Sequence, residues 1–140
     1  MKFLGGFWGV ISIIFTLAAL SRLISSGFYD KFIRGLSKKK YKRIINLTIN
    51  INSSLEENHG VFGICACISA TIHILLMNTN VEFSFWGMLT FISLLLIVIT
   101  GAINKFIYRD KKGQLKGYHK TIVLIYIVSL IIHIIFSKYI

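Results

Sequence analysis

Two histidine pairs of identical spacing constrain the fold of this chain more than any other feature. The four histidines of the sequence are His59, His73, His119 and His133, and the members of each pair are 14 positions apart. On an α-helix, such a step rises about 21 Å and turns about 1400°, which is roughly 40° short of four full turns. Both histidines of a pair would therefore project from nearly the same side of one helix, at two well-separated levels.

Four apolar segments indicate that the chain crosses a membrane four times. They cover approximately residues 3–25, 59–78, 83–104 and 118–137, and about 20 apolar residues suffice to span the ~30 Å hydrocarbon core of a bilayer. The sequence is 55% hydrophobic and contains no proline, which is unusual for a soluble domain. We therefore predict a single all-α integral membrane domain over residues 1–140, a bundle of four transmembrane helices without a soluble catalytic domain.

The net charge of +11 has its origin in two of the three connections between these segments. The connections 26–58 and 104–118 are rich in lysine and arginine, whereas the turn at 78–82 has neither. Because basic loops stay in the cytoplasm, both connections are predicted to be cytoplasmic and both chain termini to lie outside. No nucleic-acid partner is needed to explain the charge. The basic residues of the two connections are Lys31, Arg34, Lys38, Lys39, Lys40, Lys42, Arg43, Lys105, Arg109, Lys111, Lys112 and Lys116.

This topology makes the two histidine-bearing helices parallel, since both would run from the inside to the outside. His59 and His119 would then share the inner level of the bundle, and His73 and His133 the outer level. A polar side chain at such depths is costly without a partner. We therefore expect the histidines to serve a shared purpose at each level.

Axial ligation of two haems is the function that best suits such pairs. Haem iron binds axial histidine, and the second ring nitrogen of a ligand can bond a carbonyl, a hydroxyl or water. The chain contains no C-x-x-C-H motif, so covalent haem attachment is not expected. We predict two b haems between the second and fourth helices. A transition-metal or proton site is the alternative, although zinc usually requires three or four ligands and each level offers two.

Small side chains occupy the strip between the histidines of the first pair, at Gly63, Ala66 and Ala70. They either let two helices pack closely or leave room for the edge of a haem, and Gly63 is a candidate for the second role. Tyr126 lies midway between the histidines of the second pair. Its hydroxyl requires a partner in a packed bundle, or its ring lines the gap between the two haems.

Two basic side chains are placed near the inner level by their positions in the sequence. Arg22 lies about one turn from the inner end of the first apolar segment, and Lys120 follows His119 directly. Each either extends to the cytoplasmic surface or pairs with a propionate of the inner haem. The basic connection 26–58 is similarly open to two interpretations, an amphipathic helix on anionic lipid or a docking segment for an acidic or flavin-bearing redox partner.

On its four histidines and its helix topology, the whole chain resembles the dihaem cytochrome b core. This core occurs in the transmembrane domain of ferric reductases and NADPH oxidases, and in the four-helix half of respiratory cytochrome b. The direction of the histidine helices is closer to the first group. The resemblance implies an inner haem b on His59 and His119, an outer haem b on His73 and His133, and electron transfer outward across the membrane.

The sequence departs from these relatives where electrons would enter and leave. No flavin- or NAD(P)H-binding domain follows the fourth segment, and no P-E-W-Y quinol-site motif is present. We therefore expect an electron-transfer protein, or an oxidoreductase subunit, that works with a flavoprotein, a quinol or an extracytoplasmic reductase in a hetero-oligomer. The expected location is the bacterial cytoplasmic membrane.

Two further functions remain open from the sequence. One is a quinol-linked cytochrome b that anchors other subunits to the membrane. The other belongs to a different class, a non-redox proton or metal transporter subunit that uses the same four histidines and binds no chromophore. A third interpretation gives the histidines only a packing role, so that replacing them would leave partner binding intact.

Overall fold

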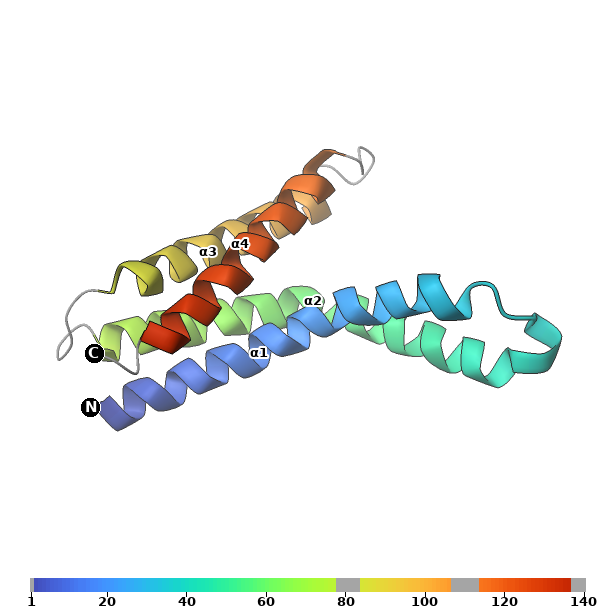
Figure 1. The fold of residues 1–140 in the computed structure, drawn as a ribbon, viewed down its shortest axis with the longest axis horizontal. Helices are drawn as coiled ribbons and strands as arrows, with labels where there is room; N and C mark the ends of the chain where they lie inside the picture. Colours follow the sequence, from blue (N-terminus) through green and yellow to red (C-terminus); the bar gives the residue numbers. More distant parts are fainter. Residues whose placement is uncertain (1, 78–83, 107–113, 137–140) are drawn as a thin grey trace.

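The chain folds into long helices with short connections, as Figure 1 shows. This computed structural model describes residues 2–77, 84–106 and 114–136. Helix α1 covers Lys2–Phe28 and continues as a π-helical turn, Tyr29–Ile33; α2 covers Lys38–Met77, α3 Phe85–Phe106 and α4 Gln114–Phe136. The described part is entirely helical apart from short connections, in agreement with the predicted all-α fold.

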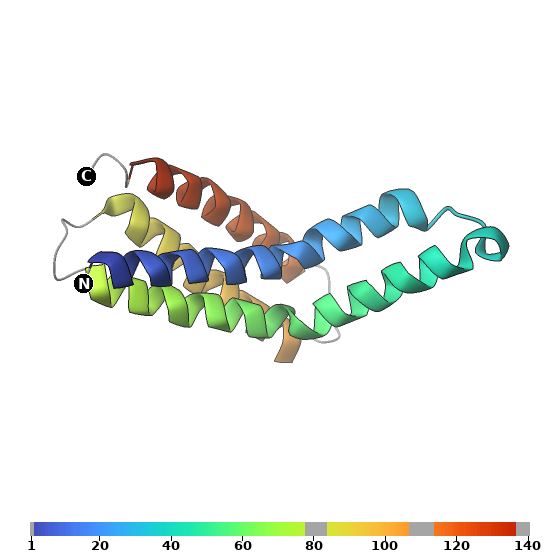
Figure 2. The ribbon, with the colours of Figure 1, turned by 90° about the horizontal axis from the view of Figure 1, so that it is seen from below.

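Two antiparallel helix pairs form the bundle. Helix α1 packs along α2, and α3 packs along α4, while α2 and α4 run in the same direction (Figures 1 and 2). The centre of contact between the pairs is a cluster of Ala66, Leu94 and Tyr126. In Figure 1 the α3–α4 pair diverges from the α1–α2 pair toward the end that lies opposite the start of α1. The histidine helices are therefore parallel, as predicted. They meet through side chains across the centre of the bundle, because the backbone of α2 lies closest to α1 and α3.

The distribution of side chains is inverted relative to that of a soluble bundle. Large apolar side chains such as Phe3, Leu17 and Leu124 are exposed, the first of them by 86%. The buried polar side chains are small hydroxyl residues, which suits helix packing in lipid, where close approach rather than hydrophobic burial holds helices together. These hydroxyl residues are Ser12, Thr16, Ser69, Thr90, Ser93 and Ser129.

All four helices are long and apolar enough to cross a membrane. The 22 residues of α3, for example, rise about 33 Å, close to the thickness of the hydrocarbon core. The fold and the outward-facing apolar surface are therefore compatible with an integral membrane protein.

The second helix is much longer than its apolar part. It was expected at 59–78 but begins at Lys38 and contains 40 residues, with a kink at Tyr41, where the backbone angles are not helical. The sequence has no glycine or proline between Gly35 and Gly60, so nothing in the backbone ends the helix where its side chains become polar. The polar composition marks the end of the membrane span rather than the end of the helix. The other three helices differ from the expected ranges by four residues or fewer at their described ends.

Residues 22–33 and 38–58 pair to form a two-helix extension, which we call the basic arm (Figure 2). Its seam contains the buried side chains of Ile33 and Ile45 and a hydrogen bond between Ser25 and Asn52. From residue 59 back to residue 42, next to the kink at Tyr41, the helix rises about 26 Å. The basic arm therefore extends well beyond the level of the first histidine pair.

Candidate functional site

The structure brings the four histidines together in the two pairs that parallel helices predict. His59 on α2 faces His119 on α4, with ring centroids 6.4 Å apart and ring planes at 72°. His73 and His133 repeat this arrangement at 6.5 Å and 73°. The two levels thus have nearly the same geometry, although they are built from different stretches of sequence.

The ring separation matches the space that one metal ion requires between two imidazoles. A metal–imidazole nitrogen bond is about 2.0–2.1 Å long, and that nitrogen lies about 1.1–1.2 Å from the centre of its ring, so two opposed ligands have centroids about 6.2–6.6 Å apart. The observed 6.4 and 6.5 Å fall within this range. Edge-to-face contact between aromatic rings covers about 4.5–7 Å, so the distances alone do not separate ligation from packing, and the hydrogen bonds have to be considered.

The histidines on α2 both donate to backbone carbonyls of α1. The Nδ1 atom of His59 lies 3.0 Å from the carbonyl oxygen of Ala19, and that of His73 lies 2.7 Å from the carbonyl oxygen of Gly5. Because a carbonyl can only accept, Nδ1 carries the proton in both rings. A neutral ring of this kind has its lone pair on Nε2, the atom that binds a metal ion.

His119 reaches the same state through a side chain of α3. Its Nδ1 atom lies 3.0 Å from the Thr100 hydroxyl oxygen, and this hydroxyl already donates to the carbonyl of Leu96 at 2.7 Å. The oxygen of Thr100 is therefore the acceptor, and His119 keeps its lone pair on Nε2. His133 differs, because its Nδ1 atom is buried without a hydrogen-bond partner in the described part of the chain.

Glycines on α1 and α3 let the backbone approach the outer histidines closely. A Cβ atom at Gly9 would lie 3.0 Å from Nδ1 of His73, and one at Gly87 would lie 3.0 Å from Cε1 of His133. Both distances are shorter than the 3.5–4.0 Å or so of a normal carbon contact. At these two positions a larger side chain would push the ring away.

The 14-residue spacing of the histidines recurs on the helices that support them. On α1, Gly5 and Ala19 supply the two acceptor carbonyls. On α3, Gly87 faces His133 and Gly101 faces His119. Sequence reasoning missed these four residues, although the glycine pair on the third segment has the same spacing as the histidines. All four helices therefore repeat the same pattern at the two levels.

The middle of the bundle, between the two levels, is filled by packed side chains. Tyr126 is only 3% exposed, and its hydroxyl shares a hydrogen bond of 3.0 Å with the hydroxyl of Thr16, which supplies the partner that the sequence required. Ser12 donates to the carbonyl of Ala66. The remaining buried hydroxyls bond carbonyls of their own helices. Within the described residues these bonds do not join into a chain from one histidine level to the other.

The small-residue strip on α2 contributes to packing between helices. Ala66 is 1% exposed and lies in the central cluster. A Cβ atom at Gly63 would meet only the side chain of Val98 on α3, at 3.9 Å. The contacts of this strip therefore fit the helix-packing interpretation, and the role of Gly63 beside a haem stays a prediction.

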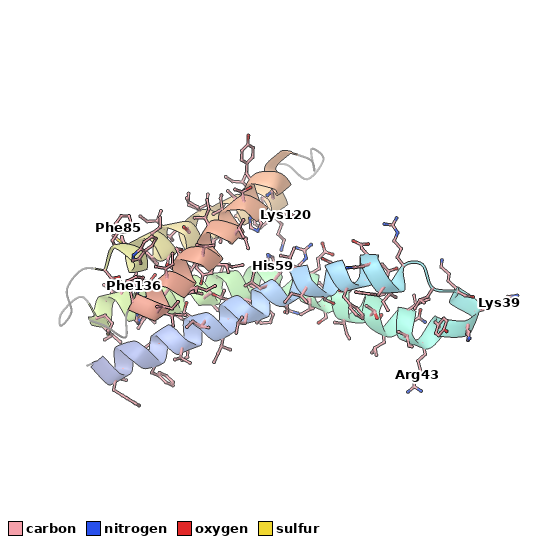
Figure 3. All side chains as sticks on the ribbon, viewed as in Figure 1. Lys39, Arg43, His59, Phe85, Lys120 and Phe136 are labelled. Carbon is pink, nitrogen blue, oxygen red and sulfur yellow. The ribbon has the colours of Figure 1, made fainter. Side chains whose placement is uncertain are left out.

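The two predicted propionate partners lie at the inner level. Arg22 forms an ion pair of 2.7 Å with Glu56, and both side chains are partly exposed. Lys120 is exposed, and Figure 3 shows it with His59 at the end where the two helix pairs diverge. Their pairing with a haem remains a prediction.

The structure also bears on the other metal sites considered. Among the described residues, no group of three or more histidine, cysteine or acidic side chains could hold a metal ion. Cys65 and Cys67 are free thiols. Each histidine level therefore offers two protein ligands, which suits a group that supplies the other ligands itself, as a haem does with its four pyrrole nitrogens.

No protein-family model, curated protein or solved structure matches the chain. The fold and site define it as a four-helix protein with a membrane-compatible surface and two histidine levels. Its function therefore has to follow from its own residues.

Proposed function

We propose that this protein is a dihaem b-type cytochrome that carries electrons across the membrane. His59 and His119 would ligate an inner haem, and His73 and His133 an outer one. The observation that carries the proposal is the state of the rings: three of the four place their lone pair on Nε2, and both pairs have the spacing of ligands to one metal ion. Packing alone would not require three of the rings to adopt the same tautomer.

The haem, when bound, supplies one-electron chemistry, and the chain's residues determine how that chemistry is used. Each haem would be held by two histidines, and ligation by two histidines would favour electron transfer over the binding of oxygen. The carbonyls of Gly5 and Ala19 and the hydroxyl of Thr100 hold the rings in one orientation and one tautomer. Rings held in this way would keep their positions during electron transfer.

The packed centre of the bundle favours electrons over protons as the transported species. A proton pathway requires hydroxyls or water molecules that pass hydrogen bonds along a chain. Here the buried hydroxyls between the levels bond carbonyls or one another in isolated groups, and Tyr126, Ala66 and Leu94 fill the space. This arrangement does not support the alternative of a proton transporter, whereas electrons cross packed protein without such a chain.

The basic arm is the surface that we assign to the cytoplasmic electron donor. Residues 28–45 carry seven basic side chains and one acidic side chain, for a net charge of +6. Because screening limits electrostatic attraction to about 8 Å at physiological salt, and the tip of the arm lies about 26 Å beyond the inner histidines, an acidic protein suits the tip better than anionic lipid. Phe28 and Phe32 are exposed, with their rings tilted against each other at a centroid distance of 5.2 Å, and they add an apolar contact. A quinol remains the alternative donor.

Transmembrane electron transfer in vesicles tests the proposal. The purified protein, reconstituted with haem, is inserted into liposomes that contain ferricyanide, and dithionite is added outside. Vesicles with the protein should consume the trapped ferricyanide, and His73→Ala should abolish this activity because it removes one step of the path. Gly60→Ala provides the control, since a Cβ atom there meets nothing within 4 Å. Equal ferricyanide consumption with and without the protein would contradict the function.

A further inference from the structure

The two histidine levels differ in one respect, the number of hydrogen bonds that support their rings. At the inner level both rings donate from Nδ1, His59 to the carbonyl of Ala19 and His119 to the hydroxyl of Thr100. At the outer level only His73 does so. His133 keeps a buried Nδ1 atom without a partner in the described residues, although its ring packs against Gly87 as that of His119 packs against Gly101.

The difference arises on α3. Thr100 precedes Gly101, and the position that corresponds to Thr100 one repeat earlier is Trp86, which precedes Gly87. Tryptophan has a donor but no acceptor. The helix therefore presents an acceptor to the inner histidine of α4 and none at the matching position for the outer one.

Hydrogen bonding to the far nitrogen changes what an imidazole ligand does to a metal ion. A ring that donates from Nδ1 gains negative charge and becomes a more basic ligand. A more basic ligand stabilises ferric iron relative to ferrous iron, so it lowers the reduction potential, and second-shell hydrogen bonding is one of the main factors by which proteins set haem potentials.

We infer that the outer haem has the higher midpoint potential and that Thr100 is the positioning residue which keeps the inner haem lower. This inference rests on the proposed dihaem function and adds a direction to it. Electrons entering at the cytoplasmic level then pass downhill from the pair His59–His119 to the pair His73–His133, which makes the chain a device for delivering electrons outward.

Positive charge near the inner level acts in the opposite sense, because it favours the less positive ferrous state. Arg22 is the nearest such group on α1, but its charge is balanced by Glu56 at 2.7 Å. Lys105 and Lys120 are exposed, so solvent and salt screen them. The hydrogen bonds are made by the ligand rings themselves and therefore determine which haem has the higher midpoint potential.

Redox titration of the protein in nanodiscs, followed by visible absorbance, tests the inference. Wild-type protein should show two separate waves, and His73→Ala, which removes the outer haem, should leave the lower one. Thr100→Val removes the acceptor at nearly constant volume and should raise only the lower wave. Thr100→Ser restores a hydroxyl and should return the midpoint potential of the lower wave to the wild-type value. Thr90→Val is the matched control on the same helix, because Thr90 bonds the carbonyl of Trp86, and it should move neither wave.

A gain-of-contact variant tests the same idea from the outer level. Trp86→Thr places an acceptor at the position that corresponds to Thr100. It should lower the midpoint potential of the upper wave and so reduce the difference between the two potentials. The inference is overturned if the wave that survives in His73→Ala is the higher one, or if Thr100→Val retains both haems without any change in potential. A protein without haem would instead refute the proposed function, so the two failures are distinguishable.

Discussion

Replacing Gly87 by alanine tests the outer site through the distance between α3 and a proposed ligand. The new Cβ atom would lie 3.0 Å from Cε1 and 3.2 Å from Nδ1 of His133. Carbon atoms prefer about 3.5–4.0 Å, so the ring has to retreat by about 0.5 Å. A metal–ligand distance tolerates only about 0.2 Å of change. We therefore expect Gly87→Ala to lose the outer haem and keep the inner one.

The matched variant is Gly101→Ala, at the equivalent position of the inner level. Its Cβ atom would lie 3.6 Å from Cε1 of His119, an ordinary contact, so both haems should be retained. The assay is the haem content per chain from the pyridine haemochrome spectrum, together with redox titration to show which wave has disappeared. The reasoning is refuted if Gly87→Ala keeps two haems at wild-type potentials, or if Gly101→Ala loses as much haem as Gly87→Ala.

Three further predictions address the centre, the arm and the inner surface. Tyr126→Phe removes the hydrogen bond to Thr16 and should destabilise the protein by about 1 kcal/mol, as thermal unfolding would measure. The absorbance spectrum should show both haems retained, and loss of either haem would contradict the prediction. Lys39→Glu with Lys42→Glu should slow haem reduction by an acidic flavodoxin in a salt-dependent manner but leave reduction by dithionite unchanged. Replacing the lysines at the two chain ends by glutamate should not change the rate with flavodoxin. If that control slowed flavodoxin as much, the basic arm would not be the docking surface. Arg22→Gln breaks a partly exposed ion pair and should change the free energy of unfolding by less than about 1 kcal/mol, as denaturant titration in detergent would show.

The histidine levels were predictable because a helical repeat is a local property of the sequence. The spacing of His59 and His73 and that of His119 and His133 place each pair on one side of a helix. Because successive spans alternate in direction, the second and fourth helices are parallel, and parallel helices with equal spacing bring the pairs to common levels. The ring pairs in the structure follow from these two facts.

The supporting shell was harder to predict because it depends on contacts between helices. Gly5, Ala19 and Thr100 are ordinary residues in the sequence, and their roles appear only when α1 and α3 are placed beside the histidines. The basic arm was anticipated only as an amphipathic helix within 26–58, and its continuity with α2 was missed for a different reason. Asparagine and serine are poor helix formers, so 38–58 resembles a loop, yet pairing with α1 keeps it helical and even Asn52 has a partner there.

The haem content of the purified protein is the most direct test of the central claim. The protein is expressed with sufficient haem supply, and its visible and pyridine haemochrome spectra are recorded with those of His59→Ala, His73→Ala and the double variant. We predict two low-spin b haems in the wild-type chain, one in each single variant and none in the double variant. A colourless wild-type protein, or a haem content that the histidine replacements do not change, would contradict the dihaem account.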